Sequence, residues 1–346
     1  MQRRITTPGP LHDGQGRLIE TGYATELIKD YDRKRVAAPR FRIKEWDYYC
    51  VTTDHYALAL TIADNGYLYM DSISLLDFDE NRQATKSAIA LPNGKRSLPP
   101  SSRAGDIRAY GRDYEMIFEN DGNRRRLFGQ MEHFPTSAKD APNLTFDLTL
   151  TDAPKDTMVI VTPFADHPKA FYYNQKINCL RAEGFVTLGD KRYTFSPDHD
   201  FAVLDWGRGV WTYDNTWYWG SASGLADGAP FGFNIGYGFG DTSAASENML
   251  FYDGAAHKLS QVKFEIPMKD GKEDYMSPWK FTSDDGRFEM DFQPIMDRSA
   301  KIDFKLLVSD QHQVFGRFTG DATLDDGRVI HVENLTGFAE KVHNKW

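Results

Sequence analysis

Short runs in which apolar and polar residues alternate dominate the chain. HYALALTIAD (55–64), LTFDLTLT (144–151) and RFEMDFQPI (287–295) place an apolar side chain at nearly every second position, which is typical of half-buried β-strands. Turn sequences separate such runs, among them PNGK, NDGN, KDGK and DDGR, because Gly and Asn tolerate the positive φ that tight hairpins need. The pattern predicts a mainly β protein built from antiparallel hairpins.

Helical spacing of apolar residues is confined to TGYATELIKDYDRKR (21–35) and GFAEKVH (337–343). We therefore expect few helices and no alternating β-α-β layers. The length of 346 residues exceeds what one hydrophobic core usually serves. Pro163 and Pro168 mark a change of rhythm between two β-rich halves. The expected organisation is an N-terminal extension with a short helix (1–40), an N-terminal β-barrel-like domain (41–170) and a C-terminal β-barrel-like domain (171–346).

Composition excludes several classes of partner. The net charge of −9 argues against nucleic acid, since no cluster of Lys and Arg could displace counterions from phosphates. The basic run at 124–126 follows a turn and is interpreted as a solvated hairpin. No secretory signal or membrane-length apolar run is present, so we expect a cytoplasmic protein without integral membrane association. Cys50 and Cys179 are expected to be buried thiols, and no metal or cofactor motif appears.

One segment concentrates the largest side chains of the chain. VLDWGRGVWTYDNTWYWGSASG (203–224) holds four of the seven tryptophans. If residues 211–223 form one strand, its odd-numbered face mixes Trp rings with Asn and Ser, as ligand cavities do, whereas a packed core face rarely includes those polar groups. The next segment, PFGFNIGYGFG (230–240), alternates bulky residues with Gly and Asn, which indicates a close approach of another group or a barrel corner.

Several of these segments resemble a known family. LDWGRGVWTYDNTWYWGSASG, FYYNQKIN, EGFVTLGDKRYTF and VENLTGFAEKVHNKW closely resemble the DUF2804 family of uncharacterised proteins, over nearly the whole chain. The Asp before Trp-Gly, followed by a Trp-x-Trp strand, is more distantly similar to double lipocalin-like proteins that include carotenoid 1,2-hydratases and related cyclases. That resemblance implies two lipocalin-like, calycin-type antiparallel β-barrels or half-barrels packed together. It also implies a ligand site in one barrel or at the barrel junction, and chemistry by protein acids without a metal.

Asp205 is the first candidate for a general acid, because a carboxyl group against the Trp206 ring loses hydration and retains its proton more readily. Arg208 could hold that carboxylate or a substrate anion; the alternative is a buried Asp205–Arg208 pair that only stabilises a turn. Tyr173 could donate to a developing oxyanion, or pack as part of a strut between domains. The residues expected to bind substrate are Trp206, Trp211, Tyr172, Asn174, Asn215, Trp217, Trp219 and Ser221.

The expected function is that of a cofactor-free acid/base enzyme of hydratase, isomerase, cyclase or lyase type. Its partner would be a small apolar or carbohydrate-like ligand in an aromatic-lined cavity. The alternative is a non-catalytic carrier of a lipid, isoprenoid or glycan. Two titratable groups that converge on one point would favour catalysis, whereas an apolar pocket without convergent acids would favour carriage.

Overall fold

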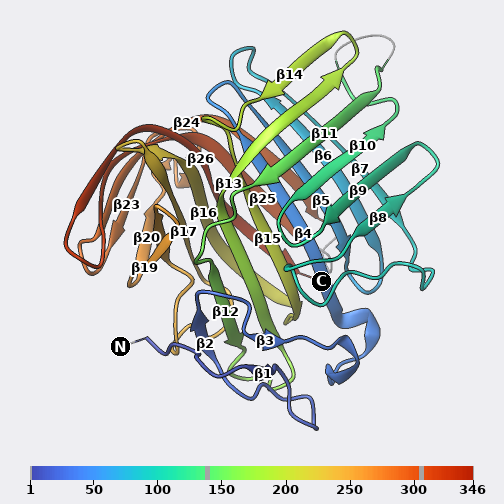
Figure 1. The fold of residues 1–346 in the computed structure, drawn as a ribbon, viewed down its shortest axis with the longest axis vertical. Helices are drawn as coiled ribbons and strands as arrows, with labels where there is room; N and C mark the ends of the chain where they lie inside the picture. The colour runs from blue at the N-terminus through green and yellow to red at the C-terminus, as the bar shows by residue number, and fades with distance from the viewer. Residues whose placement is uncertain (1, 137–140, 304–307, 346) are drawn as a thin grey trace.

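The computed structural model describes residues 2–136, 141–303 and 308–345. These residues form two strongly curled antiparallel sheets that pack against each other as half-barrels (Figure 1). Within them there is no α-helix, only two short 3-10 turns, η1 (Arg33–Arg35) and η2 (Arg40–Arg42). The expected mainly β fold of two packed half-barrels is confirmed.

The first sheet contains thirteen of the described strands. They are β2 (Gly22–Ala24), β4 (Ile43–Thr52), β5 (Tyr56–Asp64), β6 (Tyr69–Asp77), β7 (Arg82–Ala90), β8 (Ile107–Tyr110), β9 (Tyr114–Asn120), β10 (Arg125–Met131), β11 (Leu144–Thr151), β12 (Met158–Pro163), β13 (Phe171–Leu188), β14 (Lys191–Phe195) and β15 (Phe201–Val210). Its main order is β7-β6-β5-β4-β15-β13-β11-β10-β9-β8. The long strand β13 and its neighbour β15 therefore lie at the centre.

The second sheet contains nine described strands. They are β16 (Asp214–Ala226), β17 (Ala229–Tyr237), β18 (Met249–Tyr252), β19 (Ala255–Lys258), β20 (Val262–Glu265), β23 (Trp279–Ser283), β24 (Phe288–Asp303), β25 (Val308–Thr323) and β26 (Val329–Lys345). Their order is β19-β18-β17-β16-β26-β25-β24-β23-β20. Two small sheets complete the fold, one of β1 (Gly9–Pro10) with β3 (Lys29–Asp30) and one of β21 (Met268–Lys269) with β22 (Lys272–Glu273).

The chain passes from the first sheet to the second at residues 211–213, between β15 and β16. The boundary expected from sequence, marked by Pro163 and Pro168 and set before residue 171, is not where the two sheets divide. There, β12 and β13 form an antiparallel pair inside the first sheet, from Met158 opposite Lys176 to Pro163 opposite Phe171. The prolines thus mark a hairpin turn within one half-barrel. The Trp-rich segment contains the connection between the two sheets.

The two segments with helical spacing do not form α-helices, and that part of the sequence prediction is wrong. Residues 22–24 pair with the edge of β12, and only residues 33–35 make a 3-10 turn, which Asp32 caps. Residues 337–343 lie inside β26, paired with β16 and β25. In both segments the backbone hydrogen bonds offered by neighbouring strands outweigh the local helical spacing.

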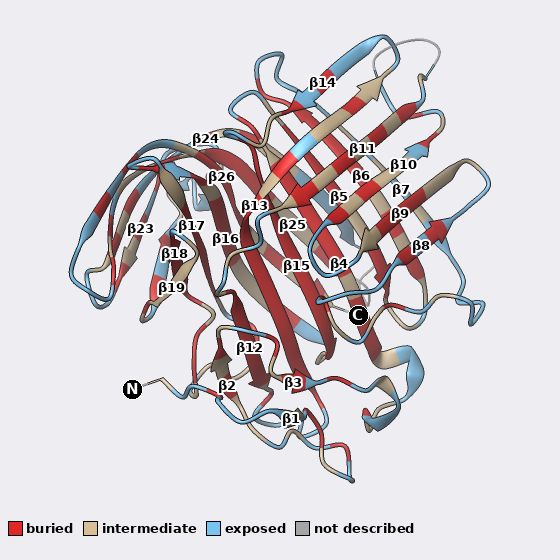
Figure 2. Ribbon diagram, viewed as in Figure 1, coloured by how far each residue is buried: buried red, intermediate tan, exposed pale blue. Residues whose placement is uncertain are grey.

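Side-chain alternation gives each central strand two different faces. In β15 the side chains of Leu204 and Trp206 enter the core of the first half-barrel, whereas Val203 belongs to a cluster with second-sheet residues. All of β15 and the first part of β13 are buried, because the second sheet covers their outer face (Figure 2). We call the layer between the outer faces of the two sheets the junction.

In the described ranges, no helix has the length and apolar character needed to cross a membrane.

Candidate functional site

A buried ion pair lies at the centre of the junction. Lys176 in β13 stands directly opposite Asp205 in β15, and Lys176 Nζ lies 2.9 Å from Asp205 Oδ2. Asn174, two residues earlier on the same face of β13, donates from Nδ2 to Asp205 Oδ1 at 2.6 Å. The Lys176 ammonium also lies 3.7 Å from the centre of the Trp219 ring, which belongs to the second sheet. Asp205 is therefore held as a charged partner by groups of its own sheet.

Asn174 has a further property that matters for ligand binding. The side chain is fully buried, and its Oδ1 is an acceptor without a hydrogen-bond partner among the described residues. Because its Nδ2 is bound to Asp205, Oδ1 remains available beside the ion pair. A buried carbonyl oxygen left unpaired costs free energy unless a ligand or water donates to it.

The second sheet contributes a carboxyl group, Glu340 of β26. Trp217 Nε1 donates to Glu340 Oε1 at 2.9 Å, and Gln313 Nε2 donates to Glu340 Oε2 at 3.0 Å. Burial raises the pKa of Glu340 to about 7, although the Trp217 hydrogen bond and the positive charge of Lys176 act in the opposite direction. Glu340 thus exchanges its proton near neutral pH, as a general acid must.

Glu247 is a third carboxyl group close to the ion pair. Burial raises its pKa, with the Lys176 charge and a hydrogen bond from Asn234 opposing that rise. Asn234 Oδ1 in turn accepts from Trp219 Nε1 at 2.7 Å. This network connects the Trp219 ring, the Lys176 ammonium and Glu247 on one side of the site.

Five aromatic side chains, which we call the aromatic wall, adjoin the charged groups: Trp46, Tyr172, Trp211, Trp217 and Phe239. Trp46 stacks on Tyr172, with ring centroids 6.2 Å apart and an angle of 14° between the planes. Trp211 meets Trp46 and Phe239 edge to face at 5.3 and 5.1 Å. The three Trp residues are only half-buried, so the wall lies between the charged groups and solvent.

Two glycines of the WGRG sequence make room for this wall. A Cβ at Gly207 would overlap the Trp46 ring, and a Cβ at Gly209 would lie 3.1 Å from Trp211 Nε1. Gly207 stands opposite Trp46 in the pairing of β15 with β4. The glycines following Asp205 therefore allow indole rings to lie flat on β15, next to the carboxylate.

Most of the residues expected to form the site come together. The junction contains Tyr172, Asn174, Asp205, Trp211, Trp217, Trp219 and Ser221. Ser221 is buried away from the ion pair's own hydrogen bonds, and its hydroxyl accepts from Asn178 Nδ2 at 2.8 Å. Asn215 instead makes a local turn, bonding through both ends of its amide to Thr212.

Three expected residues, Tyr173, Trp206 and Arg208, lie on the opposite face, inside the first half-barrel. Arg208 is fully buried, with NH2 3.1 Å from Asp47 Oδ1 and its guanidinium carbon 4.2 Å from the centre of the Trp206 ring. Tyr173 donates its hydroxyl to the Lys29 carbonyl at 2.7 Å. Because Arg208 is three positions from Asp205 on one strand, the two side chains point to opposite faces. The alternative Asp205–Arg208 pair does not form. Asp205 pairs with Lys176, and Arg208 pairs with Asp47.

Glu340 of the second sheet was not among the predicted site residues, nor were Lys176, Trp46 and Gln313. Glu340 was hidden because its segment was interpreted as a helix, although its spacing from Phe338 also fits one face of a strand. Lys176 could have been found, since Tyr172, Asn174 and Lys176 alternate on one face of FYYNQKIN. Trp46 and Gln313 carry no recognisable motif.

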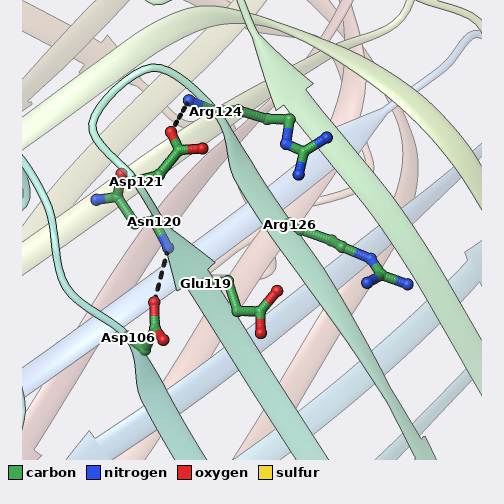
Figure 3. A pocket seen from close by; sticks show the side chains of 6 residues that line it. All are labelled: Asp106, Glu119, Asn120, Asp121, Arg124 and Arg126. Carbon is green, nitrogen blue, oxygen red and sulfur yellow. Dashed lines mark hydrogen bonds between the residues drawn. The ribbon is translucent and has the colours of Figure 1, made fainter.

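Two hollows lie outside the charged centre. One, of about 210 Å³, is a surface hollow over the β9–β10 hairpin, lined by Asp106, Glu119, Asn120, Asp121, Arg124 and Arg126 (Figure 3). Its charges pair locally, for example Arg126 with Asp147 at 2.7 Å, as expected of a solvated hairpin; Arg125 is the exception, being buried and bonded to the Ser102 carbonyl. The other, of only about 10 Å³, adjoins the junction beside Cys50, Val203, Ser221 and Phe338.

The fold is similar to that of three solved proteins. Kievitone hydratase from Nectria haematococca superposes with a TM-score of 0.51 and 12% identity over 97% of this chain and 98% of that chain. CghA, crystallised with Sch210972, gives 0.51 and 11% identity over 97% of each chain. A candidate AttH protein from Nitrosomonas europaea gives 0.51 and 16% identity over 90% of this chain and 96% of the other. At such identities the likeness concerns the fold alone.

No curated protein matches the chain. The family model described as "Domain of unknown function (DUF2804)" matches residues 2–346, which confirms the resemblance noted in the Trp-rich segment. The chain therefore belongs to the DUF2804 family.

Proposed function

We propose that the protein is an acid/base enzyme of hydratase, isomerase, cyclase or lyase type, acting at the junction on a small apolar or carbohydrate-like substrate. One observation carries the proposal: the junction buries two carboxyl groups that have different partners. Asp205 is ion-paired with Lys176 at 2.9 Å, whereas burial raises the pKa of Glu340 to about 7. Two carboxyl groups held in environments that differ in this way can act as the acid and the base of one reaction.

The roles differ in part from those expected from sequence. Glu340 takes the part of general acid, because burial raises its pKa to about 7 and a large fraction therefore carries a proton near neutral pH. Asp205, held by Lys176 and Asn174, acts as base or as the fixed negative charge of the site. The unpaired Asn174 Oδ1 accepts a hydroxyl or water proton of the bound substrate.

The aromatic wall suits the substrate class. Indole and phenol faces attract positive charge that develops when an alkene or an acetal is protonated. The same faces also bind sugar rings and apolar skeletons. The names of the fold neighbours point in the same direction, since one is a hydratase, but at 12% identity this support is an analogy between folds.

The test begins with the ligand. Native mass spectrometry of the purified protein identifies what co-purifies, and the isolated compound is then incubated with the wild type in D₂O and followed by NMR. Acid/base catalysis predicts a changed product or solvent deuterium on carbon. Return of the compound unchanged and without deuterium would contradict catalysis and favour the alternative, a carrier of a lipid, isoprenoid or glycan.

Variants then assign the roles. Glu340→Gln and Asp205→Asn should each lower turnover by roughly 10²- to 10⁴-fold, because each removes a transferable proton or its acceptor. Glu333→Gln, an exposed carboxyl group of the same strand β26, is the matched control and should retain full activity. Melting temperatures are compared as well, since Asp205→Asn leaves the buried Lys176 without its ionic partner. Full turnover in Glu340→Gln would overturn the proposal, whereas full turnover in Asp205→Asn alone would remove only the role given to Asp205.

A further inference from the structure

A chain of three buried side chains leads from the first sheet to Glu340. Tyr48 of β4 donates its hydroxyl to Gln313 Oε1 at 3.3 Å, and Gln313 Nε2 of β25 donates to Glu340 Oε2 at 3.0 Å. Tyr48, Gln313 and Glu340 are each at most 8% exposed. These hydrogen bonds therefore connect the first sheet to the second across the junction, and they end at one carboxyl oxygen of Glu340, the proposed acid.

The orientation of the Gln313 amide matters because its two ends have opposite hydrogen-bonding capacity. In the observed orientation, Nε2 supports the carboxylate form of Glu340. In the reversed orientation, Oε1 would face Glu340 and would accept a hydrogen bond from the O–H group of its carboxylic acid form. That proton would then be shared with Gln313 and withheld from a substrate. The Tyr48 hydroxyl favours the observed orientation, because it donates to Oε1 on the far side.

We propose that Gln313 is a positioning residue for the acid of the junction, and that the Tyr48 hydroxyl sets the orientation of its amide. Gln313 and Trp217 each donate one hydrogen bond, to Oε2 and Oε1 of Glu340 respectively. Both oxygens are therefore acceptors toward protein, and the exchangeable proton occupies a lone pair that neither donor uses. This inference rests on the acid role proposed for Glu340 and adds what directs its proton.

Other charged and titratable groups also act on Glu340. The charges that act on the pKa of Glu340 are those of Lys176 from β13, Arg298 from β24 and Asp205 from β15. Three buried groups that remain neutral also feel its charge: Tyr48 and Cys50 from β4 and Tyr172 from β13. Gln313→Leu changes none of the three charges; of the three neutral groups it affects only Tyr48, whose hydroxyl loses its acceptor.

The experiment measures the proton on Glu340 directly. Infrared difference spectra recorded across pH show the carboxyl band of Glu340, assigned by its loss in Glu340→Gln. In Gln313→Leu the midpoint of that band should move upward by about one pH unit, a tenfold fall in acidity, because the carboxylate loses a buried N–H donor. Tyr48→Phe removes only a hydroxyl and should move the midpoint in the same direction, since the amide is then free to reverse.

Gln311→Leu is the matched control, being on the same strand with its amide bonded to Ser309; its midpoint should equal that of the wild type. The wild type supplies a readout that needs no variant. The side-chain amide NMR signal of Gln313 should shift with the same midpoint as Glu340. A merely structural Gln313 would lower the melting temperature in Gln313→Leu while leaving the Glu340 midpoint unchanged, and that result, or a Gln313 signal that does not titrate, would overturn the inference.

The two proposals fail separately. Full turnover in Glu340→Gln removes the proposed function, whatever the infrared midpoint does. An unmoved midpoint in Gln313→Leu with reduced turnover in Glu340→Gln removes only the positioning role.

Discussion

At the scale of single residues, Glu340 links the proposed chemistry to stability. Its ordinary pKa is 4.5, and burial raises the pKa to about 7 in the folded protein. Between these values the folded protein holds a proton that the unfolded chain releases. Because the folded state then binds more protons, the free energy of unfolding falls as pH rises through this window.

We expect Glu340→Gln to remove this dependence. A window of about 2.5 pH units at ~1.4 kcal/mol each corresponds to a wild-type loss of roughly 3 kcal/mol between about pH 4.5 and pH 7. Urea denaturation of both proteins across this range measures the free energy of unfolding. The variant should become more stable relative to the wild type as pH rises. Glu333→Gln, with its carboxyl group in solvent, should follow the wild type. Parallel curves for Glu340→Gln and the wild type would mean that Glu340 ionises normally.

At the scale of elements, β15 combines two tasks on its two faces. Its inner face carries Trp206 and Arg208 into the first half-barrel, and its outer face presents Asp205 to the junction. Beyond Asp205, the outer face carries Gly207 and Gly209, where the indole rings of Trp46 and Trp211 lie. The strand therefore sets both the charge of the site and the position of its aromatic wall.

Gly207→Ala tests this arrangement. The added methyl group would overlap the Trp46 ring and displace it from Tyr172. We expect a loss of stability of roughly 1–3 kcal/mol, as for other overpacked sites, together with a changed tryptophan fluorescence spectrum and weaker ligand binding. Gly14→Ala, where a Cβ meets nothing within 4 Å, is the control. An unchanged spectrum in Gly207→Ala would show that Trp46 does not lie on β15 in solution.

At the scale of the whole molecule, the two half-barrels are joined by contacts that include charged and amide groups. Asn178, in the irregular part of β13, donates to Ser221 Oγ at 2.8 Å and to the Phe233 carbonyl at 3.0 Å in the second sheet. Phe239, which follows β17, packs against Tyr172 of the first sheet, and Trp219 of the second sheet packs against Tyr48. The site exists only where both sheets meet.

Limited proteolysis distinguishes this arrangement from two separable domains divided near residue 170. The exposed turn at 165–169 is open to cleavage, yet it connects two strands that pair with each other. β15 also pairs with β4, from Phe201 opposite Thr52 to Val210 opposite Ile43. A cut at 165–169 should therefore give two fragments that co-elute on gel filtration and separate only in denaturant. Fragments that separate without denaturant would contradict the shared first sheet.

The sequence by itself determined the strand content and which side chains of the Trp-rich segment share one face. Period-two alternation is a local property, so HYALALTIAD and LTFDLTLT could be identified as strands without knowledge of their partners. The same alternation placed Trp217, Trp219 and Ser221 on one face of β16. Trp219 and Ser221 contact β13 across the junction, and Trp217 binds Glu340 of the neighbouring strand β26. DUF2804 membership was likewise readable from the Trp-rich segment.

Only the tertiary structure decided which carboxyl groups meet. Glu340 comes close to Lys176 and Asp205 because β26 and β13 lie in different sheets that pack face to face, and no local period encodes that contact. Packing also decided that Arg208 pairs with Asp47 inside the first half-barrel, while Lys176 pairs with Asp205 in the junction. In the segment 337–343, helical spacing and strand spacing were both possible locally, and hydrogen bonds from β16 and β25 selected the strand. Ionic partners follow from which strands become neighbours, and the burial of apolar surface between distant parts of the chain determines that choice.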